Sequence, residues 1–496
     1  MPSTPSFSAA QKLAESFLRR FSTVTASARR RNLYSRINPL GDPSVSIVPV
    51  LDEWIEEGNA VNGYYLKDVV KFLRNRKRLS HALEVSEWMS SKGLCPISPS
   101  DLAVQLDLIG RVRGVESAER YFQSLNDGDK TYQLHGALLN CYVREGLVDK
   151  SLSQMQKMKD MGVVCCINYN SLMYLYLQTQ QLEKVPDVLA EMQKDGVPPN
   201  IFSYRLCINS YGDRGDLENV EKLLEEMERE PHIDTDWITY SMVAKFYIKA
   251  GMKEKALVNL KKCEEKAEKG NAVAYDHLIG HYAALGGKGA VMRVWKLQKA
   301  NCKKQLNREY ITMLSSLVKL GEFDMAEEVV GEWELSGNVC DFRVPNIVLI
   351  GYCQSGLVEK AEALLQRLVA EGKTPTPNSW AITASGYVAK DNMEKAFQCI
   401  KEAFAVLVQN KRWRPKDDVI SSIFSWVTDN KDIGEVEEFV NSLKSLNAMN
   451  RNIYVSLIKT YVKHGKDVDE ILERMKVDNI ELDQEMEEAL NSYSRF

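Results

Sequence analysis

Residues 166–200 read CINYNSLMYLYLQTQQLEKVPDVLAEMQKDGVPPN, and features of this stretch return along most of the chain. Its Tyr176 and its Gly196 each belong to a series of like residues that recur about every 35 positions. A fixed period of about 20 to 50 residues is the signature of a repeat architecture, and it determines the whole fold. The rest of the chain is therefore best interpreted from this period.

The tyrosine series shows the period most clearly. Its members are separated by 34, 35, 36, 35, 70, 35 and 74 residues, and Leu317 and Val427 fill the two long gaps. They are Tyr142, Tyr176, Tyr211, Tyr247, Tyr282, Tyr352, Tyr387 and Tyr461. This register predicts about ten repeats over residues 132–482, which begin near residues 132, 166, 201, 237, 272, 307, 342, 377, 417 and 451.

Glycines predict where the helices of each repeat end. One series follows the tyrosines by four residues, as at Gly146 and Gly215, and a second series, with Gly196, closes the next helix. Glycine accepts the left-handed conformation of a helix C-cap. Each repeat is therefore expected to be a helix hairpin, and neighbouring hairpins must stack to bury their apolar faces. The predicted fold class is all-α: a right-handed superhelical solenoid of tandem helix-turn-helix repeats.

Charge divides the chain into two parts. Residues 1–36 hold seven basic residues and one acid, so subtraction from the totals of 64 and 68 leaves 57 bases against 67 acids, about −10, for the remainder. No apolar run approaches the roughly 18 residues of a membrane-spanning helix. The ten cysteines form no Cys-x-x-Cys pair, which favours buried thiols over a disulfide framework or a zinc site.

The N-terminus has the composition of an organellar targeting sequence. It is rich in Arg and Ser, and the stretch Ala9 to Phe21 is amphipathic, with Leu13 and Phe17 on its apolar face. Arg19-Arg20-Phe21 before Ser22 is similar to a mitochondrial processing site, so residues 1–36 are predicted to be a mitochondrial transit peptide. The alternative is the basic, disordered N-terminus of a cytosolic protein.

Three further segments complete the predicted organisation. Residues 37–62, which contain several prolines, are expected to be a linker, and residues 63–131 to hold two divergent repeats. The second helices of those two repeats are recognised at Ala82 and Ala118, 36 residues apart. Residues 483–496 are expected to cap the C-terminal end of the stack.

The repeat resembles that of plant P-class pentatricopeptide repeat proteins of mitochondria. Residues 166–200 match its pattern of a Tyr-Asn start, a Met late in the second helix, and Gly followed by Pro-Asn at the boundary. The matching residues are Tyr169, Asn170, Tyr176, Met192, Gly196, Pro199 and Asn200. Tetratricopeptide repeats share the hairpin, but their paired Trp and Gly do not recur here. The resemblance extends over roughly residues 65 to 480.

The resemblance implies a reader of single-stranded RNA that takes one base per repeat. In this family, the residue after the aromatic and the last residue of the repeat select the base. Asn170 with Asn200 resembles a pyrimidine pair and Ser241 with Asn271 an adenine pair. Ser421 with Asn450 resembles the adenine pair more weakly.

The resemblance also implies base-clamping and phosphate-contacting positions. The clamping residues would be the apolar Ile167, Phe202, Ile238 and Val273. The phosphate contacts would be Arg144, Lys249, Lys319 and Lys463. Both sets have plainer interpretations, since Asn170 and Asn200 also suit a capping role and the basic residues also suit a solvated helix face.

The base code is incomplete elsewhere in the chain. Selector positions are occupied by Gly136, Arg205, Asp276, Ile311 and Ala381, and clamp positions by Arg308, Arg343, Asn378 and Asp418. His277 and His281 lie one helical turn apart, as in a metal site, but without the Glu of a zinc protease, so a packing or groove role is favoured. No catalytic residue, metal or cofactor is predicted.

These observations leave two functions open. The first is a non-catalytic protein of the mitochondrial matrix that binds single-stranded organellar RNA and acts in RNA processing, stability or translation. The second is a scaffold that binds proteins or the mitochondrial ribosome, which the acidic body and the degraded code favour. A chloroplast location and an enzymatic activity are the less favoured alternatives.

Overall fold

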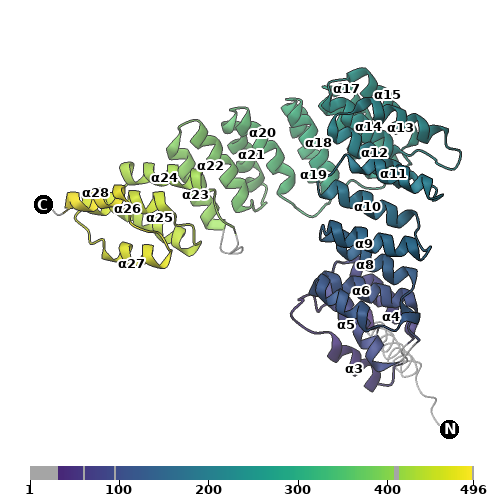
Figure 1. Cartoon of the computed structure of the whole chain (residues 1–496). Helices are drawn as coiled ribbons and strands as arrows, with labels where there is room; N and C mark the ends of the chain where they lie inside the picture. The colour runs from purple at the N-terminus through teal and green to yellow at the C-terminus, as the bar shows by residue number, and fades with distance from the viewer. Residues whose placement is uncertain (1–31, 60–61, 94–95, 407–412, 494–496) are drawn as a thin grey trace, which may run out of the picture. The chain divides into compact units, whose positions relative to one another are not determined.

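The computed structural model describes residues 32–59, 62–93, 96–406 and 413–493, without the side chains of residues 491–493. The basic N-terminal stretch up to residue 31 lies outside these ranges, so the predicted transit peptide is described only at its end. Every regular element in the described ranges is helical, as the sequence predicted (Figure 1). The chain forms two compact units, residues 1–235 and 236–496.

The described part of unit 1 begins with a short pair of helices, which five hairpins follow. The pair is α2 (Leu33–Ile37) and α3 (Val48–Glu56). The hairpins are α4 (Gly63–Asn75) with α5 (Leu79–Lys92), α6 (Pro99–Arg113) with α7 (Val115–Ser124), α8 (Tyr132–Arg144) with α9 (Val148–Asp160), α10 (Cys166–Gln178) with α11 (Lys184–Lys194), and α12 (Ile201–Arg214) with α13 (Leu217–Arg229). A 3₁₀ turn, Asp127–Asp129, precedes α8.

The described part of unit 2 holds seven hairpins and a last single helix. They are α14 (Trp237–Lys249) with α15 (Lys253–Lys266), α16 (Ala272–Ala284) with α17 (Lys288–Asn301), α18 (Asn307–Lys319) with α19 (Phe323–Leu335), α20 (Arg343–Gln354) with α21 (Val358–Ala370), α22 (Pro377–Ala389) with α23 (Met393–Val406), α24 (Asp417–Asn430) with α25 (Ile433–Ser445), and α26 (Arg451–Lys463) with α27 (Asp469–Val477). The last is α28 (Gln484–Tyr493).

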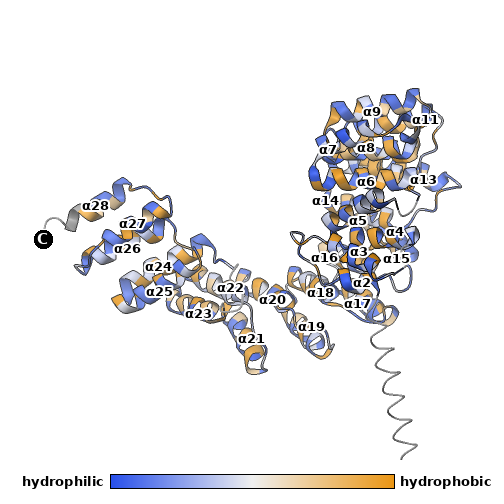
Figure 2. Cartoon of the chain, turned by 90° about the horizontal axis from the view of Figure 1, so that it is seen from below, coloured by the Kyte–Doolittle hydropathy of each residue, from blue (hydrophilic) through white to orange (hydrophobic). Residues whose placement is uncertain are grey.

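Within each unit the hairpins stack through their first helices. In unit 1, α8 packs between α6 and α10, and in unit 2 each first helix from α16 to α24 packs between its two counterparts. Most helices carry both hydrophobic and hydrophilic residues (Figure 2), and the buried residues are mostly hydrophobic. The predicted glycines have positive φ at the helix ends, for example +70° at Gly146 and +73° at Gly196.

Six of the eight tyrosines of the series are buried, Tyr211 and Tyr461 are half-buried, and several of the eight tie successive hairpins together. Tyr352 is fully buried on α20, and its hydroxyl donates to Glu327 on α19 of the preceding hairpin. Tyr387 and Glu362 repeat this bond one hairpin later. A buried hydroxyl needs such a partner, which explains why tyrosine recurs at this position.

The predicted linker over residues 37–62 is wrong for most of its length. Ile47, Leu51 and Trp54 are buried, and Trp88 Nε1 on α5 donates to Asp52 at 3.0 Å. Pro49 lies in the first turn of α3, where the missing N–H costs nothing. The proline content therefore marked the start of a helix and not an unstructured segment.

The C-terminal helix α28 packs against α26. Met486 is its fully buried residue, and Arg451 pairs with Asp483 and with Glu485. No helix in the described part of the chain combines the length and the apolar character needed to cross a bilayer.

Candidate nucleic-acid interface

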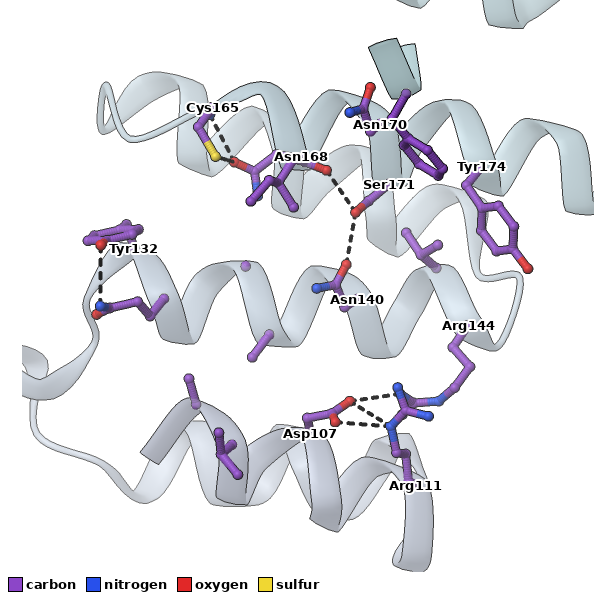
Figure 3. Close-up of a pocket in the computed structure, with 18 of the residues that line it drawn as sticks. Asp107, Arg111, Tyr132, Asn140, Arg144, Cys165, Asn168, Asn170, Ser171 and Tyr174 are labelled. Carbon is purple, nitrogen blue, oxygen red and sulfur yellow. Dashed lines mark hydrogen bonds and ion pairs between the residues drawn. The ribbon is translucent and has the colours of Figure 1, made fainter. Parts of the chain in front are cut away.

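A cleft of about 1060 Å³ runs along the first helices of unit 1. Residues of α4, α6, α8, α10 and α12 line it, and Figure 3 shows its central part. Five predicted site residues lie on its wall: Arg144, Ile167, Asn170, Asn200 and Phe202. The stacking of first helices thus brings residues from three repeats into one groove.

Asn170 and Asn200, the last residue of the same repeat, are in direct contact. Asn170 Nδ2 donates to Asn200 Oδ1 at 3.3 Å. Asn200 is the N-cap of α12, because its Oδ1 also accepts from the backbone N–H of Phe202 and of Ser203, each at 3.0 Å. Cap geometry therefore fixes the position of this side chain.

The side-chain amides of Asn170 and Asn200 differ in exposure and in the hydrogen-bonding groups that remain available to a ligand. Asn170 is 5% exposed, and Ser203 Oγ donates to its Oδ1 at 2.7 Å. Asn200 is exposed, and among the described residues no acceptor is recorded for its Nδ2. The Asn200 amide group therefore presents donors to the groove, while Asn170 and Ser203 hold it in place.

The predicted clamp residues are all exposed, although they are large and apolar. Ile167 is 65% exposed and Phe202 47% in unit 1, and Ile238 and Val273 are each 39% exposed in unit 2. Two aromatic residues of the same cleft, Tyr132 (57%) and Tyr174 (52%), were not singled out from the sequence. Exposed apolar and aromatic faces are what base stacking requires.

Ser241 and Asn271 do not pair with one another in unit 2. Asn271 caps α16 by accepting from the N–H of Ala274 at 3.3 Å. The Ser241 hydroxyl instead lies 3.2 Å from His277 Nδ1 and 3.0 Å from His281 Nε2. The sequence signal was present, because His277 and His281 are one turn apart on the helix that follows, but it was interpreted only for metal binding and packing.

Partial burial of the rings favours the neutral form of this histidine pair, and His277 keeps an exposed face. Burial lowers the pKa of His277, and it lowers the pKa of His281 to about 4, with further repulsion from His277, Lys245 and Lys319. Trp237 packs edge to face on His277, with ring centroids 5.5 Å apart. Within the described residues no group of three or more metal-ligating side chains is present.

The residues of the third predicted selector pair, Ser421 and Asn450, are in direct contact. Asn450 Nδ2 donates to Ser421 Oγ at 3.1 Å, and Asn450 Oδ1 accepts from the N–H of Ile453 as the N-cap of α26. Asn346 holds the equivalent of the Asn170 position on α20, and its buried Oδ1 lacks a partner among the described residues. The 35-residue spacing could have identified Asn346.

Charges that pair internally occupy some of the remaining positions of unit 2, whereas other positions hold uncharged residues. Arg308 contacts Asp276 at 3.3 Å and Glu309 at 2.6 Å, and Arg343 contacts Asp341 at 2.6 Å. These side chains neutralise one another at the positions where the repeat pattern expects a clamp and a selector.

The predicted phosphate-contacting residues fall into two groups. Arg144 is bound to Asp107 at 3.0 Å. Lys249, Lys319 and Lys463 are exposed near the ends of their helices, and no ion pair with a described residue is recorded for them. The three lysines are thus placed to meet an anion from solvent.

Comparison with known proteins gives consistent matches along the chain. A model of the PPR repeat matches residues 135–163, 202–232, 310–338 and 344–372, and a model of the PPR repeat family matches residues 164–213. The chain is 46% identical over 472 residues to "Pentatricopeptide repeat-containing protein At4g21705, mitochondrial" of Arabidopsis thaliana, covering 95% of this chain and 96% of that protein.

Two further matches are more distant. The "Large ribosomal subunit protein mL101 (rPPR4)" of Arabidopsis thaliana is 31% identical, with 93% of this chain and 95% of that protein covered. The crystal structure of "the pentatricopeptide repeat protein PPR10 from maize" is 18% identical with a TM-score of 0.49, and the match covers 89% of this chain and 62% of that one.

Proposed function

This chain belongs to the pentatricopeptide repeat family, and from that premise we propose that it is a P-class member that binds single-stranded RNA in mitochondria. It acts without catalysis, by occupying a transcript and so influencing its processing, stability or translation. The groove of first helices in unit 1 is the binding surface.

One observation carries this proposal: polar selectors and exposed apolar residues share a single cleft. Asn200 presents amide donors there, and Ile167 and Phe202 expose apolar faces on the adjoining repeats. A base that inserts beside Asn200 can stack on an apolar side chain while its edge accepts a hydrogen bond. Pyrimidine carbonyl oxygens are acceptors of that kind.

The mitochondrial location rests on two observations that agree. The relative of 46% identity carries "mitochondrial" in its name, and the N-terminus of this chain is rich in Arg and almost free of acids. We place the protein in the matrix, where organellar transcripts are found.

Ultraviolet crosslinking in isolated mitochondria, followed by sequencing of the retained RNA, tests the proposal. We expect a few short single-stranded sites to be enriched. Asn200→Asp keeps the helix cap but replaces the amide donors by a carboxylate, and it should reduce recovery of those sites about 10-fold. The matched control is Gln193→Glu, which adds the same charge on the exposed face of α11 and should change recovery less than twofold.

A second candidate function is a structural role in the mitochondrial ribosome. The similarity to a large ribosomal subunit protein favours it, as do the internally paired charges of Asp276 and Arg308. In that case the protein should sediment with large ribosomal subunits through a high-salt wash. Crosslinking should then recover ribosomal RNA alone, and Asn200→Asp should change nothing.

A further inference from the structure

Three arginines from successive first helices of unit 1 converge on one carboxylate. Arg74 of α4, Arg111 of α6 and Arg144 of α8 contact Asp107 at 3.5, 2.9 and 3.0 Å. Figure 3 shows Arg111 and Arg144 reaching Asp107 from two helices. Only Arg144 is among the residues that the repeat pattern identified.

The cluster leaves positive charge in the groove. These three guanidinium groups and Asp107 are the charged residues that line the cleft, so three positive charges face one negative charge and two remain. Glu145 approaches Arg144 at 3.6 Å, but it is 50% exposed and is not part of the cleft wall. This local excess of positive charge contrasts with the rest of the chain, which is acidic overall beyond its N-terminal segment.

A neighbouring cavity extends this basic surface. It measures about 540 Å³, shares Arg74 and Arg111 with the cleft, and adds the charged residues Lys67, Lys71 and Asp101. Lys67 pairs with Asp101 at 2.7 Å. Lys71 is exposed, and no ion pair with a described residue is recorded for it.

The arginines keep donors free for a ligand. Each guanidinium has five N–H donors, far more than one carboxylate can accept from three of them. Asp107 is only 14% exposed, whereas Arg74 and Arg111 are 38% and 41% exposed. The buried carboxylate of Asp107 therefore holds the guanidinium groups in place on one side. The N–H groups on their other side remain available to a ligand in the groove. A guanidinium group can donate two parallel hydrogen bonds to two oxygens of one phosphate.

We infer that this cluster binds a terminal phosphate monoester of an RNA strand that lies in the groove. A monoester carries about −1.5 to −2 at neutral pH, close to the two excess charges, whereas a backbone diester carries only about −1. The inference rests on the proposed RNA-binding function and adds an end specificity to it. The strand end would lie one to two repeats from Asn170.

Three RNAs of one sequence test this inference by fluorescence anisotropy with the full chain. One carries a 5′-monophosphate, one a 3′-monophosphate, and one has hydroxyl groups at both ends. We expect one of the two phosphorylated RNAs to bind about 10-fold more tightly than the hydroxyl-ended RNA. Which end is preferred identifies the strand polarity at the cluster. Equal affinity for all three RNAs would overturn the inference.

Variants locate the preference within the cluster. Arg111→Gln should abolish the preference while hydroxyl-ended RNA still binds, and Arg111→Lys, which keeps the charge but not the fork, should retain part of it. Arg229→Gln on α13 is the matched control, because Arg229 is 77% exposed and pairs with Glu225 on its own helix. A preference that survives Arg111→Gln with an unchanged melting temperature would contradict the assignment.

Acidification gives an independent readout. The second ionisation of a phosphate monoester has a pKa of about 6, whereas arginine stays charged. The preference should therefore shrink at pH 5, where the monoester carries a single charge, and persistence at full size would contradict the charge argument. If hydroxyl-ended RNA binds and phosphate adds nothing, only this inference fails. If no RNA binds, the proposed function fails with it.

Discussion

At the scale of single residues, hydrogen bonds between repeats account for the recurring tyrosines. Burial and the bond to Glu362 raise the pKa of Tyr387 to about 12, which shows that the neutral hydroxyl is the form that the fold stabilises. Lys395 donates both to Tyr387 at 3.1 Å and to Glu362 at 2.8 Å. A tyrosine is thus required for its hydroxyl as well as for its ring.

Tyr387→Phe isolates the hydroxyl contribution. The ring stays packed and Glu362 keeps Lys395 as a partner. The hydrogen bond that the hydroxyl donates to Glu362 and the one that it accepts from Lys395 are lost, so we expect the free energy of unfolding to fall by about 1–2 kcal/mol. Urea unfolding followed by circular dichroism measures this. No change in the midpoint would show that the bond contributes nothing to stability.

The histidine pair of unit 2 predicts a pH dependence. An unfolded histidine has its pKa near 6.5, and that of His281 is lowered to about 4 in the fold. Between these values the unfolded chain binds more protons than the folded chain, so stability falls as the pH falls. From pH 7 to pH 5 the wild type should lose more stability than His281→Asn, by on the order of 1 kcal/mol.

The comparison of these two proteins is informative because carboxylates titrate equally in both. His277, Lys245 and Lys319 repel a proton on His281, and the bond to Ser241 favours one. Equal pH dependence in the wild type and in His281→Asn would mean that His281 is protonated in the folded chain near its ordinary pKa.

Sequence reasoning at the residue scale succeeded where one backbone rule decides the position. The capping role that the sequence offered for Asn200 is present, because Asn200 is the N-cap of α12, whereas Asn170 lies inside α10. It failed where partners come from different helices. The contacts of Ser241 with His277 and of Arg74 with Asp107 depend on how hairpins stack, and a period does not show which side chains then meet.

At the scale of helices, close approach of neighbouring first helices explains glycines inside them. A Cβ at Gly386 of α22 would lie 2.6 Å from Cys353 Sγ and 2.8 Å from Val358 Cγ2. Glycine here costs helix propensity but allows α20 and α22 to pack. The periodic sequence predicted the helices and not which of their faces are in contact.

Two substitutions separate packing from propensity. Gly386→Ala should lower the free energy of unfolding by about 1–3 kcal/mol, because overpacking outweighs the gain in helix propensity. Gly331→Ala on α19 has open space around the added Cβ and should raise stability by about 0.5–1 kcal/mol. Thermal melting of both variants measures these stability changes. Stabilisation by Gly386→Ala would contradict the close packing inferred around Gly386.

The N-terminal helices predict where a cleaved leader ends. Leu33 and Ile37 of α2 are buried, and Arg36 binds Glu57 through both oxygens, so loss of residues up to 36 would remove a packed helix. We therefore expect the mature protein to begin before Asn32, so the leader predicted over residues 1–36 extends too far; processing after Phe21 fits this shorter leader. N-terminal sequencing of the protein from mitochondria tests this, and a first residue beyond Leu33 would contradict it.

At the scale of the whole molecule, the two units carry different groove chemistry. In unit 1, exposed Ile167, Phe202 and Tyr174 accompany a net positive cleft. In unit 2, Asp276 and Arg308 pair where a selector and a clamp would lie. The sequence predicted the repeats along the whole chain, because one period specifies every hairpin. It did not predict the concentration of positive charge in unit 1, which arises from tertiary contacts.

The most direct test of the account is to crosslink the purified protein to single-stranded RNA containing 4-thiouridine and to identify the crosslinked peptides by mass spectrometry. We predict adducts on the first helices of unit 1, above all at Phe202 and Tyr174 and on the peptide that contains Ile167. Adducts confined to second helices such as α9, α11 and α13, or no adducts above those of an unrelated acidic protein, would contradict the claim that this groove binds RNA.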